Sequence, residues 1–378
     1  MTSEIDPNEL VESFQVDAWV HWLGGFVNNH KGLWTWLGNL ETGMLSEAMA
    51  DIEIRQPIYV TSLARSGSTL LLEILHRHPD LTSHCYRDYP MLFTPYMWNR
   101  YLSRTPQNDS QMKERTHRDG IFITPQSPEA FEEVLWMAFF ENLHDPERSA
   151  VLDGQTSNPG FEKFYRDHIR KLLLAGGGRR YLAKGNYNLT RLSYLLKLFE
   201  DARIVIPVRE PIWHIASLIN QHRRFCQGQE LCPRALTHLQ RVGHFEFGLD
   251  RRSINPGDDE RVRLIIDLWE NGAEVEGWAR YWALIHDFLA DEWSAKPELQ
   301  EAVKIVRYEA FCEAPAEGVQ TLFDHCRLEA EDALLAAAAD MIRPASLRLP
   351  GIFSKEDLTV IERCTSDSAH RLGLGSRV

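Results

Sequence analysis

Apolar and polar positions along the chain predict short strands that alternate with helices. Strands are predicted at residues 58–63, 179–184, 202–210 and 302–311. The runs at 58–63 and 202–210 have the continuous apolar composition of strands buried on both faces. Helix patterns follow the first three predicted strands directly. This alternation predicts an α/β fold with three layers, in which a central parallel sheet is flanked by helices and elaborated by helical insertions.

The patterning outside these units predicts further helices. In residues 127–143, Ser127 as N-cap and Pro128 at the first helical position predict where an amphipathic helix begins. Residues 227–262, with Gly, Pro and charged side chains, are interpreted as a long excursion. No internal repeat or low-complexity linker divides the chain, so one domain is predicted. Its expected parts are a tryptophan-rich helical extension packed on the main body (1–50), a core (55–316) and a C-terminal helical part (317–378).

The turn after the first predicted strand carries the residue types of an anion site. It contains Arg65, Gly67 and the hydroxyl side chains of Ser66, Ser68 and Thr69. Glycine permits a tight turn and close backbone approach, and the unpaired amides at a helix N-terminus favour anions. Arginine adds a planar, permanent charge suited to phosphate or sulfate oxygens. The alternative interpretation is an ordinary helix cap beside a surface arginine.

A second strand end repeats this chemistry. The strand at 202–210 reaches Arg209, Pro211 begins the next helix, and Ser217 lies less than two turns inside it. Ligands of open α/β sheets bind at the carboxyl ends of the strands. Arg209 and Ser217 are therefore predicted to share one anion near the first turn. A surface ion pair of Arg209 with Glu210 or another acid is the alternative.

Composition restricts the partners. The chain has 378 residues, of which 44% are hydrophobic and 25% charged, as expected for a globular protein with a large core. A formal net charge of −13 argues against nucleic acid or an anionic membrane as the partner. The acidic N-terminal sequence differs from a signal peptide, and no apolar run reaches transmembrane length. The scattered cysteines lack zinc-site spacing, so a cytoplasmic protein with free thiols and no bound metal is expected.

Taken together, these segments resemble the sulfotransferases that use 3′-phosphoadenosine 5′-phosphosulfate, in their bacterial and tyrosylprotein-like branch. The residues from Arg65 to Leu70 match the R-S-G-T/S-T-L loop of that family. Arg209, Pro211 and Ser217 match its second motif, an arginine, a proline and a serine at this spacing.

Two further segments carry the resemblance. Residues 181–211 resemble the family's K-x-P…R-D-P block, with Lys184 at the lysine. They depart from it at Gly185-Asn186 and Glu200, where prolines are common, and at Glu210, which replaces an aspartate. The segment VRYEAFCEAP resembles the V-x-Y-E motif and contains Tyr308. The matches extend from about residue 55 to about residue 316.

The resemblance implies a P-loop-like fold and a role for each matched residue. The first loop, Arg65 to Leu70, would hold the 5′-phosphosulfate, and Arg209 with Ser217 would hold the 3′-phosphate. Tyr308 would contact the adenine side of the nucleotide. Lys184 and Arg65 would act on the transferring sulfuryl group, which carries less charge than a phosphoryl group and is expected to need no metal ion.

The acceptor hydroxyl needs a proton acceptor near the first loop. In the tyrosylprotein branch this is a glutamate after an H-P-D segment, but the matching positions here hold Cys85 and Tyr86. Asp88 is the first substitute, because the short connection after the first-loop helix is expected to place it near the sulfuryl group. His117 and His84 are the other candidates.

The alternative interpretation is that these candidates have only structural roles. Asp88 would then form an ion pair with Arg87, and His117 would contact Asp119. The aromatic segment 86–101 suits an apolar acceptor pocket and equally suits ordinary packing.

The predicted function is transfer of a sulfuryl group from 3′-phosphoadenosine 5′-phosphosulfate to the hydroxyl of a small-molecule acceptor. Two other classes remain open: a kinase-like phosphotransferase that binds ATP and Mg²⁺, and a nucleotide-binding module without catalysis. Ser68 and Thr69 stand where a P-loop kinase or NTPase carries lysine and a hydroxyl residue, which disfavours the first of these classes.

Overall fold

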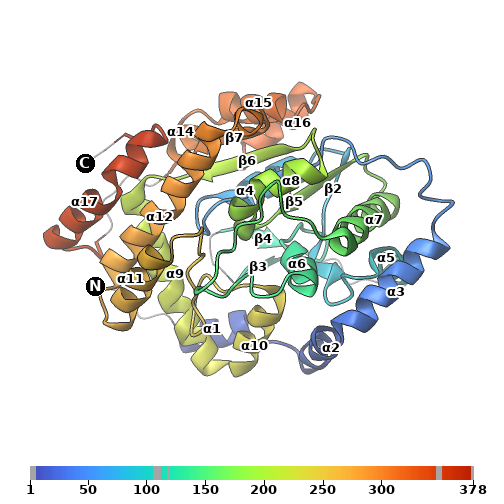
Figure 1. Ribbon diagram of the computed structural model, residues 1–378, viewed down its shortest axis with the longest axis horizontal. Helices are drawn as coiled ribbons and strands as arrows, with labels where there is room; N and C mark the ends of the chain where they lie inside the picture. Colours follow the sequence, from blue (N-terminus) through green and yellow to red (C-terminus); the bar gives the residue numbers. More distant parts are fainter. Residues whose placement is uncertain (1–5, 105–111, 117–119, 346–350, 376–378) are drawn as a thin grey trace.

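The computed structural model describes residues 6–104, 112–116, 120–345 and 351–375. A five-stranded sheet with the order β2-β5-β1-β6-β7 lies at its centre (Figure 1). Every neighbouring pair in this sheet is parallel, which confirms the predicted α/β fold. The strands are β1 (Ile58–Val60), β2 (Leu81–Thr82), β5 (Arg180–Lys184), β6 (Arg203–Val208) and β7 (Val303–Arg307).

Alternate side chains along the strands enter two different cores, because successive side chains of a strand point to opposite faces. Tyr59 packs in the core formed with α7 (Pro159–Gly176), α8 (Leu192–Leu198), α9 (Pro211–Leu231) and α12 (Glu274–Ala295). Ile58 and Val60 pack on the opposite face, against α4 (Ser68–His76), α15 (Pro315–His325) and α16 (Asp332–Ala339). The three predicted layers are therefore present.

The other elements surround this unit (Figure 1). They are α1 (Pro7–Phe14), α2 (Ala18–Asn29), α3 (Lys31–Met44), α5 (Pro95–Leu102), α6 (Glu132–Phe139), α10 (Pro233–Val242), α11 (Asp259–Glu270), α13 (Pro297–Ala302), α14 (Tyr308–Glu313), α17 (Lys355–Arg371), the 3-10 turns η1 (Tyr86–Asp88) and η2 (Asn186–Arg191), and the hairpin of β3 (Lys113–Glu114) with β4 (Phe122–Ile123). No helix among the described residues has the length and apolarity needed to cross a membrane.

The predicted start of the helix in residues 127–143 is wrong. Helix α6 begins at Glu132, because the preceding residues pair with the segment after β2. Pro128 forms an antiparallel bridge with Cys85, and the Ser127 carbonyl accepts a hydrogen bond of 3.1 Å from the amide of Tyr86. This pairing takes Ser127 and Pro128 out of the helix.

The N-terminal helices are joined to the main body by a buried ion pair. The Lys171 Nζ of α7 lies 3.0 Å from Glu41 Oε2 of α3, and both side chains are fully buried. Of the tryptophans in this helical extension, Trp34 is buried, whereas Trp19, Trp22 and Trp36 are exposed. We propose that the whole chain forms one domain.

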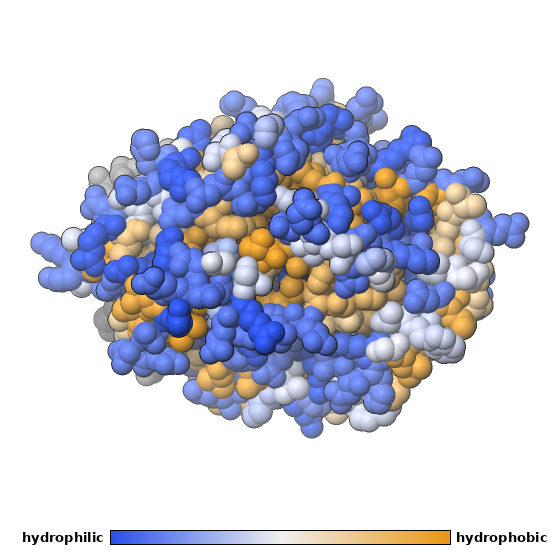
Figure 2. Space-filling view, viewed as in Figure 1, coloured by the Kyte–Doolittle hydropathy of each residue, from blue (hydrophilic) through white to orange (hydrophobic). Residues whose placement is uncertain are grey.

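The excursion predicted at 227–262 contains helices and a returning loop. Helix α9 continues to Leu231, α10 follows, and the loop after α10 comes back to the turn that follows β5. There the Phe245 amide donates a hydrogen bond of 3.0 Å to the Tyr187 hydroxyl. Hydrophilic side chains dominate the face of the molecule in Figure 2, with apolar groups near its centre.

Candidate functional site

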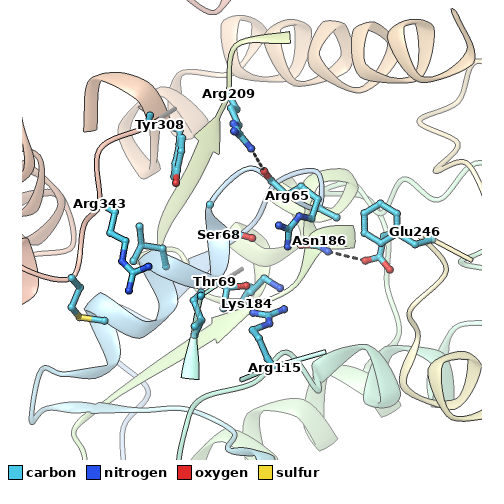
Figure 3. Close-up of a pocket in the computed structure, with 18 of the residues that line it drawn as sticks. Arg65, Ser68, Thr69, Arg115, Lys184, Asn186, Arg209, Glu246, Tyr308 and Arg343 are labelled. Atoms are coloured by element: carbon cyan, nitrogen blue, oxygen red, sulfur yellow. Dashed lines mark hydrogen bonds between the residues drawn. The ribbon is translucent and has the colours of Figure 1, made fainter. Parts of the chain in front are cut away.

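A pocket lies at the carboxyl ends of the central strands (Figure 3), where open α/β sheets bind ligands. Eight residues predicted from the sequence line it: Arg65, Gly67, Ser68, Thr69, Leu70, Lys184, Arg209 and Tyr308. They come from four separate segments, namely the β1–α4 turn and the ends of β5, β6 and β7. Parallel strands bring these segments together because their carboxyl ends meet at one edge of the sheet.

The geometry of the first turn requires glycine at one position. Gly67 has φ +99°, in the left-handed region, and caps α4 without a side-chain hydrogen bond. A Cβ added to Gly67 would lie 2.5 Å from the Tyr308 ring, so the ring packs directly on the backbone of the turn. The first amides of α4 therefore stay uncapped by a side chain beside the pocket.

A buried histidine holds the start of the turn in place. His214 of α9 lies with Nε2 2.8 Å from the Ala64 carbonyl oxygen, and its Nδ1 accepts a hydrogen bond of 3.1 Å from Trp282 Nε1. Burial lowers the pKa of His214 well below its ordinary value, so the imidazole is neutral and its Nε2–H donates to Ala64. Ser66 is also internal, since its hydroxyl bonds to that of Ser62 and it does not line the pocket.

Arg65 connects the two predicted anion motifs. Its Nε donates a hydrogen bond of 3.2 Å to the Ser217 hydroxyl, and its carbonyl accepts one of 3.4 Å from Arg209 Nη1. Arg65 has φ +70°, which is uncommon for a residue other than glycine and costs roughly 1–3 kcal/mol. Ser217 is next to Arg65 and does not line the pocket. That Ser217 and Arg209 share one anion stays a prediction.

Arg209 has an acidic partner, which the alternative interpretation allowed, but this partner is Glu309 and not Glu210. Its Nε lies 3.5 Å from Glu309 Oε1, and Glu309 is 4% exposed. Glu309 also accepts a hydrogen bond of 3.2 Å from the backbone amide of Glu210. The Arg209 guanidinium lies 5.3 Å from the centre of the Tyr308 ring. The ion pair and the ring therefore orient Arg209 at the pocket wall.

Two additional basic residues line the pocket, Arg115 and Arg343. In Figure 3, Arg343 and Tyr308 lie on one side of Lys184, and Asn186 and Glu246 lie on the other. With Arg65, Lys184 and Arg209, the two additional residues make five cationic side chains among the described residues that line this pocket, in a chain whose net charge is −13. Such a concentration favours an anionic ligand with more than one charged group.

The acidic side of the pocket contains a histidine–glutamate pair. His244 Nδ1 lies 3.2 Å from Glu246 Oε2, and Asn186 Nδ2 donates a hydrogen bond of 2.7 Å to Glu246 Oε1. Both His244 and Glu246 line the pocket. Burial raises the pKa of Glu246, but His244 and Asn186 overcome this effect and lower the pKa to about 2. The carboxylate is therefore ionised at neutral pH.

The structure corrects the expected position of Asp88. This residue lies outside the pocket and is 3% exposed. The 3-10 turn η1 directs the Asp88 carboxylate back onto the segment that carries it. There Asp88 Oδ2 accepts a hydrogen bond of 2.9 Å from the Cys85 amide and lies 3.2 Å from His84 Nδ1. Asn99 Nδ2 donates to the other oxygen at 3.1 Å. His117 lies outside the described residues.

Sequence reasoning missed Asn186, the first residue of η2, and four residues in loops: Arg115, His244, Glu246 and Arg343. Only Asn186 carried a signal, as a departure from the K-x-P pattern. Among the described residues, no group of three or more His, Cys, Asp or Glu is arranged to hold a metal ion.

Comparisons with known proteins agree with the fold. A family model described as the sulfotransferase family matches residues 57–245, half of the chain. The crystal structure of sulfotransferase STF9 from Mycobacterium avium is similar, with 14% identity, a TM-score of 0.50, and coverage of 89% of this chain and 82% of that chain. Sulfotransferase STF1 from Mycobacterium tuberculosis H37Rv aligns at 16% identity and a TM-score of 0.46, with coverage of 96% and 90%. No curated protein sequence matches.

Proposed function

The chain belongs to the sulfotransferase family, and from this premise we propose that it transfers a sulfuryl group from 3′-phosphoadenosine 5′-phosphosulfate to the hydroxyl of a small molecule. One observation carries the proposal. The first turn, Lys184, Arg209 and Tyr308 line the same pocket, although they come from four strand ends. The donor carries phosphate groups on the 3′ and the 5′ oxygens of its ribose and an adenine base. Cations at two positions and one aromatic side chain in the same pocket suit these groups.

We propose the following roles for these residues toward the donor. The amides and hydroxyls of Ser68 and Thr69 bind the 5′-phosphosulfate, and Arg209 binds the 3′-phosphate. Tyr308, packed on Gly67, contacts the adenine side. The Ser217 hydroxyl accepts a hydrogen bond from Arg65 Nε, so Ser217 contributes by orienting Arg65. The bound donor supplies the sulfuryl group and a bisphosphate leaving group.

Catalysis by these residues rests on position and charge. Sulfuryl transfer resembles phosphoryl transfer, in which charge spreads over the oxygens of the transferring group. Fixed cations aimed at that charge lower the barrier without reorganisation. Lys184 and Arg65 line the pocket from adjacent strand ends, which supports this role.

The bisphosphate product, 3′-phosphoadenosine 5′-phosphate, is expected to raise the melting temperature, whereas ATP is not, with or without Mg²⁺. A ligand that binds only the folded state stabilises it by about 2.7 kcal/mol at 100 times its dissociation constant. A thermal-shift titration measures this directly. Equal shifts from ATP would favour the kinase-like alternative and contradict the proposal.

Arg209→Ala is expected to weaken binding of the bisphosphate by about 1.5–3 kcal/mol, the usual contribution of a charged hydrogen-bond partner. This corresponds to roughly 10- to 150-fold in the dissociation constant, measured by titration calorimetry. Arg223→Ala is the matched control, because Arg223 is exposed on the following helix α9 and does not line the pocket. Unchanged affinity in Arg209→Ala, with the variant folded, would restrict Arg209 to its ion pair with Glu309.

A further inference from the structure

We propose that His244 is the general base that accepts the proton of the acceptor hydroxyl, and that Glu246 and Asn186 are positioning residues that orient it. The inference rests on the proposed function, since it concerns the acceptor of the same transfer. It replaces Asp88, which the structure places outside the pocket.

The geometry of three side chains carries this inference. His244 Nδ1 faces Glu246 Oε2 at 3.2 Å, while Asn186 Nδ2 holds the other carboxylate oxygen at 2.7 Å. A carboxylate that accepts the Nδ1–H of a histidine selects the tautomer in which Nε2 accepts a proton. The His244 side chain is 24% exposed and lines the same pocket as Lys184, the residue proposed to act on the sulfuryl group.

The position in the pocket separates the acceptor from the nucleotide. In Figure 3, Glu246 and Asn186 lie on the far side of Lys184 from Tyr308 and Arg343. The proposed nucleotide contacts are on the Tyr308 side. An acceptor hydroxyl on the Glu246 side would lie opposite the proposed nucleotide contacts, the arrangement that in-line attack requires. It would also lie near His244, which contacts Glu246.

The charges around His244 come from several elements. Burial lowers its pKa, and Glu246 and Glu129 raise it, whereas Lys184 lowers it; the net direction is upward. His238 of α10 also interacts electrostatically with His244. A raised pKa makes His244 protonated, and inactive as a base, below that value, so turnover should fall on the acidic side of the pH profile.

The acceptor oxygen forms a bond to sulfur as the bond from sulfur to the bridging oxygen of the donor breaks. The electron pair of that bond stays on the bisphosphate, and the hydroxyl proton moves to His244 Nε2. No oxidant or reductant takes part.

The test compares turnover and binding in the full chain. His244→Asn and His244→Gln are expected to lower kcat by about 10²–10⁴-fold, with bisphosphate affinity within a few-fold of wild type. His370→Asn, at an exposed histidine of α17, is the matched control and should keep wild-type kcat. If both His244 variants are folded and keep more than about a tenth of wild-type kcat, His244 is not the base.

Glu246→Gln supplies a readout that a purely structural role would not move. Without the carboxylate, the pKa of His244 should fall, so the acidic limb of the kcat profile should move to lower pH. Titration of the His244 ring protons by NMR in the ligand-free protein should show the same shift. An unshifted His244 pKa would overturn the positioning role of Glu246.

The main competitor is Glu129, which lies close to Lys184 and Arg115 but does not line the pocket. A 10²–10⁴-fold loss of kcat in Glu129→Gln together with activity in the His244 variants would transfer the role of base to Glu129. If wild-type protein fails to bind the bisphosphate, the proposed function itself fails, and the NMR result still reports separately on the His244–Glu246 pair.

Discussion

Lys184→Ala is expected to lower kcat by about 10²–10³-fold, the usual cost of removing one fixed donor to developing charge. The expected change in affinity for the bisphosphate product is much smaller, because this product lacks the sulfuryl group. Interactions that strengthen only in the transition state appear in kcat and not in ground-state binding. Turnover at saturating donor and calorimetry with the bisphosphate measure the two quantities separately.

The position of Lys184 explains why this effect should be large. It is the last residue of β5, in register with Val60 of β1, and the next residue is also fixed because the Gly185 amide donates to the Val60 carbonyl at 3.1 Å. Lys184 is 5% exposed and lines the pocket beside Arg65. A cation held on a central strand needs little reorganisation during the reaction.

Lys304→Ala is the matched control, because Lys304 lies on β7 and does not line the pocket. It should retain wild-type kcat. Lys184→Arg should recover part of the loss, since it keeps the charge but changes the geometry. A folded Lys184→Ala with wild-type turnover would contradict the catalytic role, and an affinity loss as large as the kcat loss would assign Lys184 to donor binding.

Glu133→Gln is expected to lower the free energy of unfolding by about 3–5 kcal/mol, the cost of breaking a buried ion pair on one side. Glu133 of α6 accepts two hydrogen bonds of 2.8 Å from Arg191, and His144 Nε2 lies 2.8 Å from the same carboxylate. The Arg191 side chain is fully buried and lies over the Trp136 ring at 4.6 Å. The substitution would leave the arginine charge buried without its carboxylate.

This ion pair also matters for the pocket. Arg191 is the last residue of the 3-10 turn η2, and the pocket residue Asn186 is the first residue of that turn. The ion pair of Arg191 therefore helps to hold the turn that carries Asn186. Denaturant unfolding measures the stability, and Glu141→Gln, at an exposed position after α6, is the control. A loss below about 1 kcal/mol, which is typical of exposed pairs, would contradict the expected contribution.

The pH dependence of this effect has a definite sign. Burial raises the pKa of Glu133, but Arg191 and His144 outweigh burial and lower it from 4.5 to about 2. A pKa that is lower in the folded state gives stability that is fully present above the unfolded value and is lost as pH falls through the folded value. The difference between wild type and Glu133→Gln should therefore shrink between about pH 4.5 and pH 2.

The sequence alone determined the parts of the site that follow from local pattern. Apolar runs predict the buried strands, and parallel strands place their carboxyl ends at one edge. Arg65, Lys184, Arg209 and Tyr308 each follow or end such a run, so their meeting in one pocket was predictable without coordinates. Gly67 was predictable in the same way, because the turn needs a left-handed residue.

Only the tertiary structure decided the contacts between distant loops. Asn186 and Glu246 are 60 residues apart, and no periodicity relates the loop after α10 to the end of β5. Pairing between two irregular segments removed Pro128 from the predicted helix, and the η1 turn directed Asp88 onto its own backbone. Local propensity reports the conformation of a short segment, whereas these contacts depend on how separate segments pack. Of the five pocket cations among the described residues, Arg65, Lys184 and Arg209 were therefore predictable from the sequence. The other two, Arg115 and Arg343, were not, and neither was the pair of His244 with Glu246.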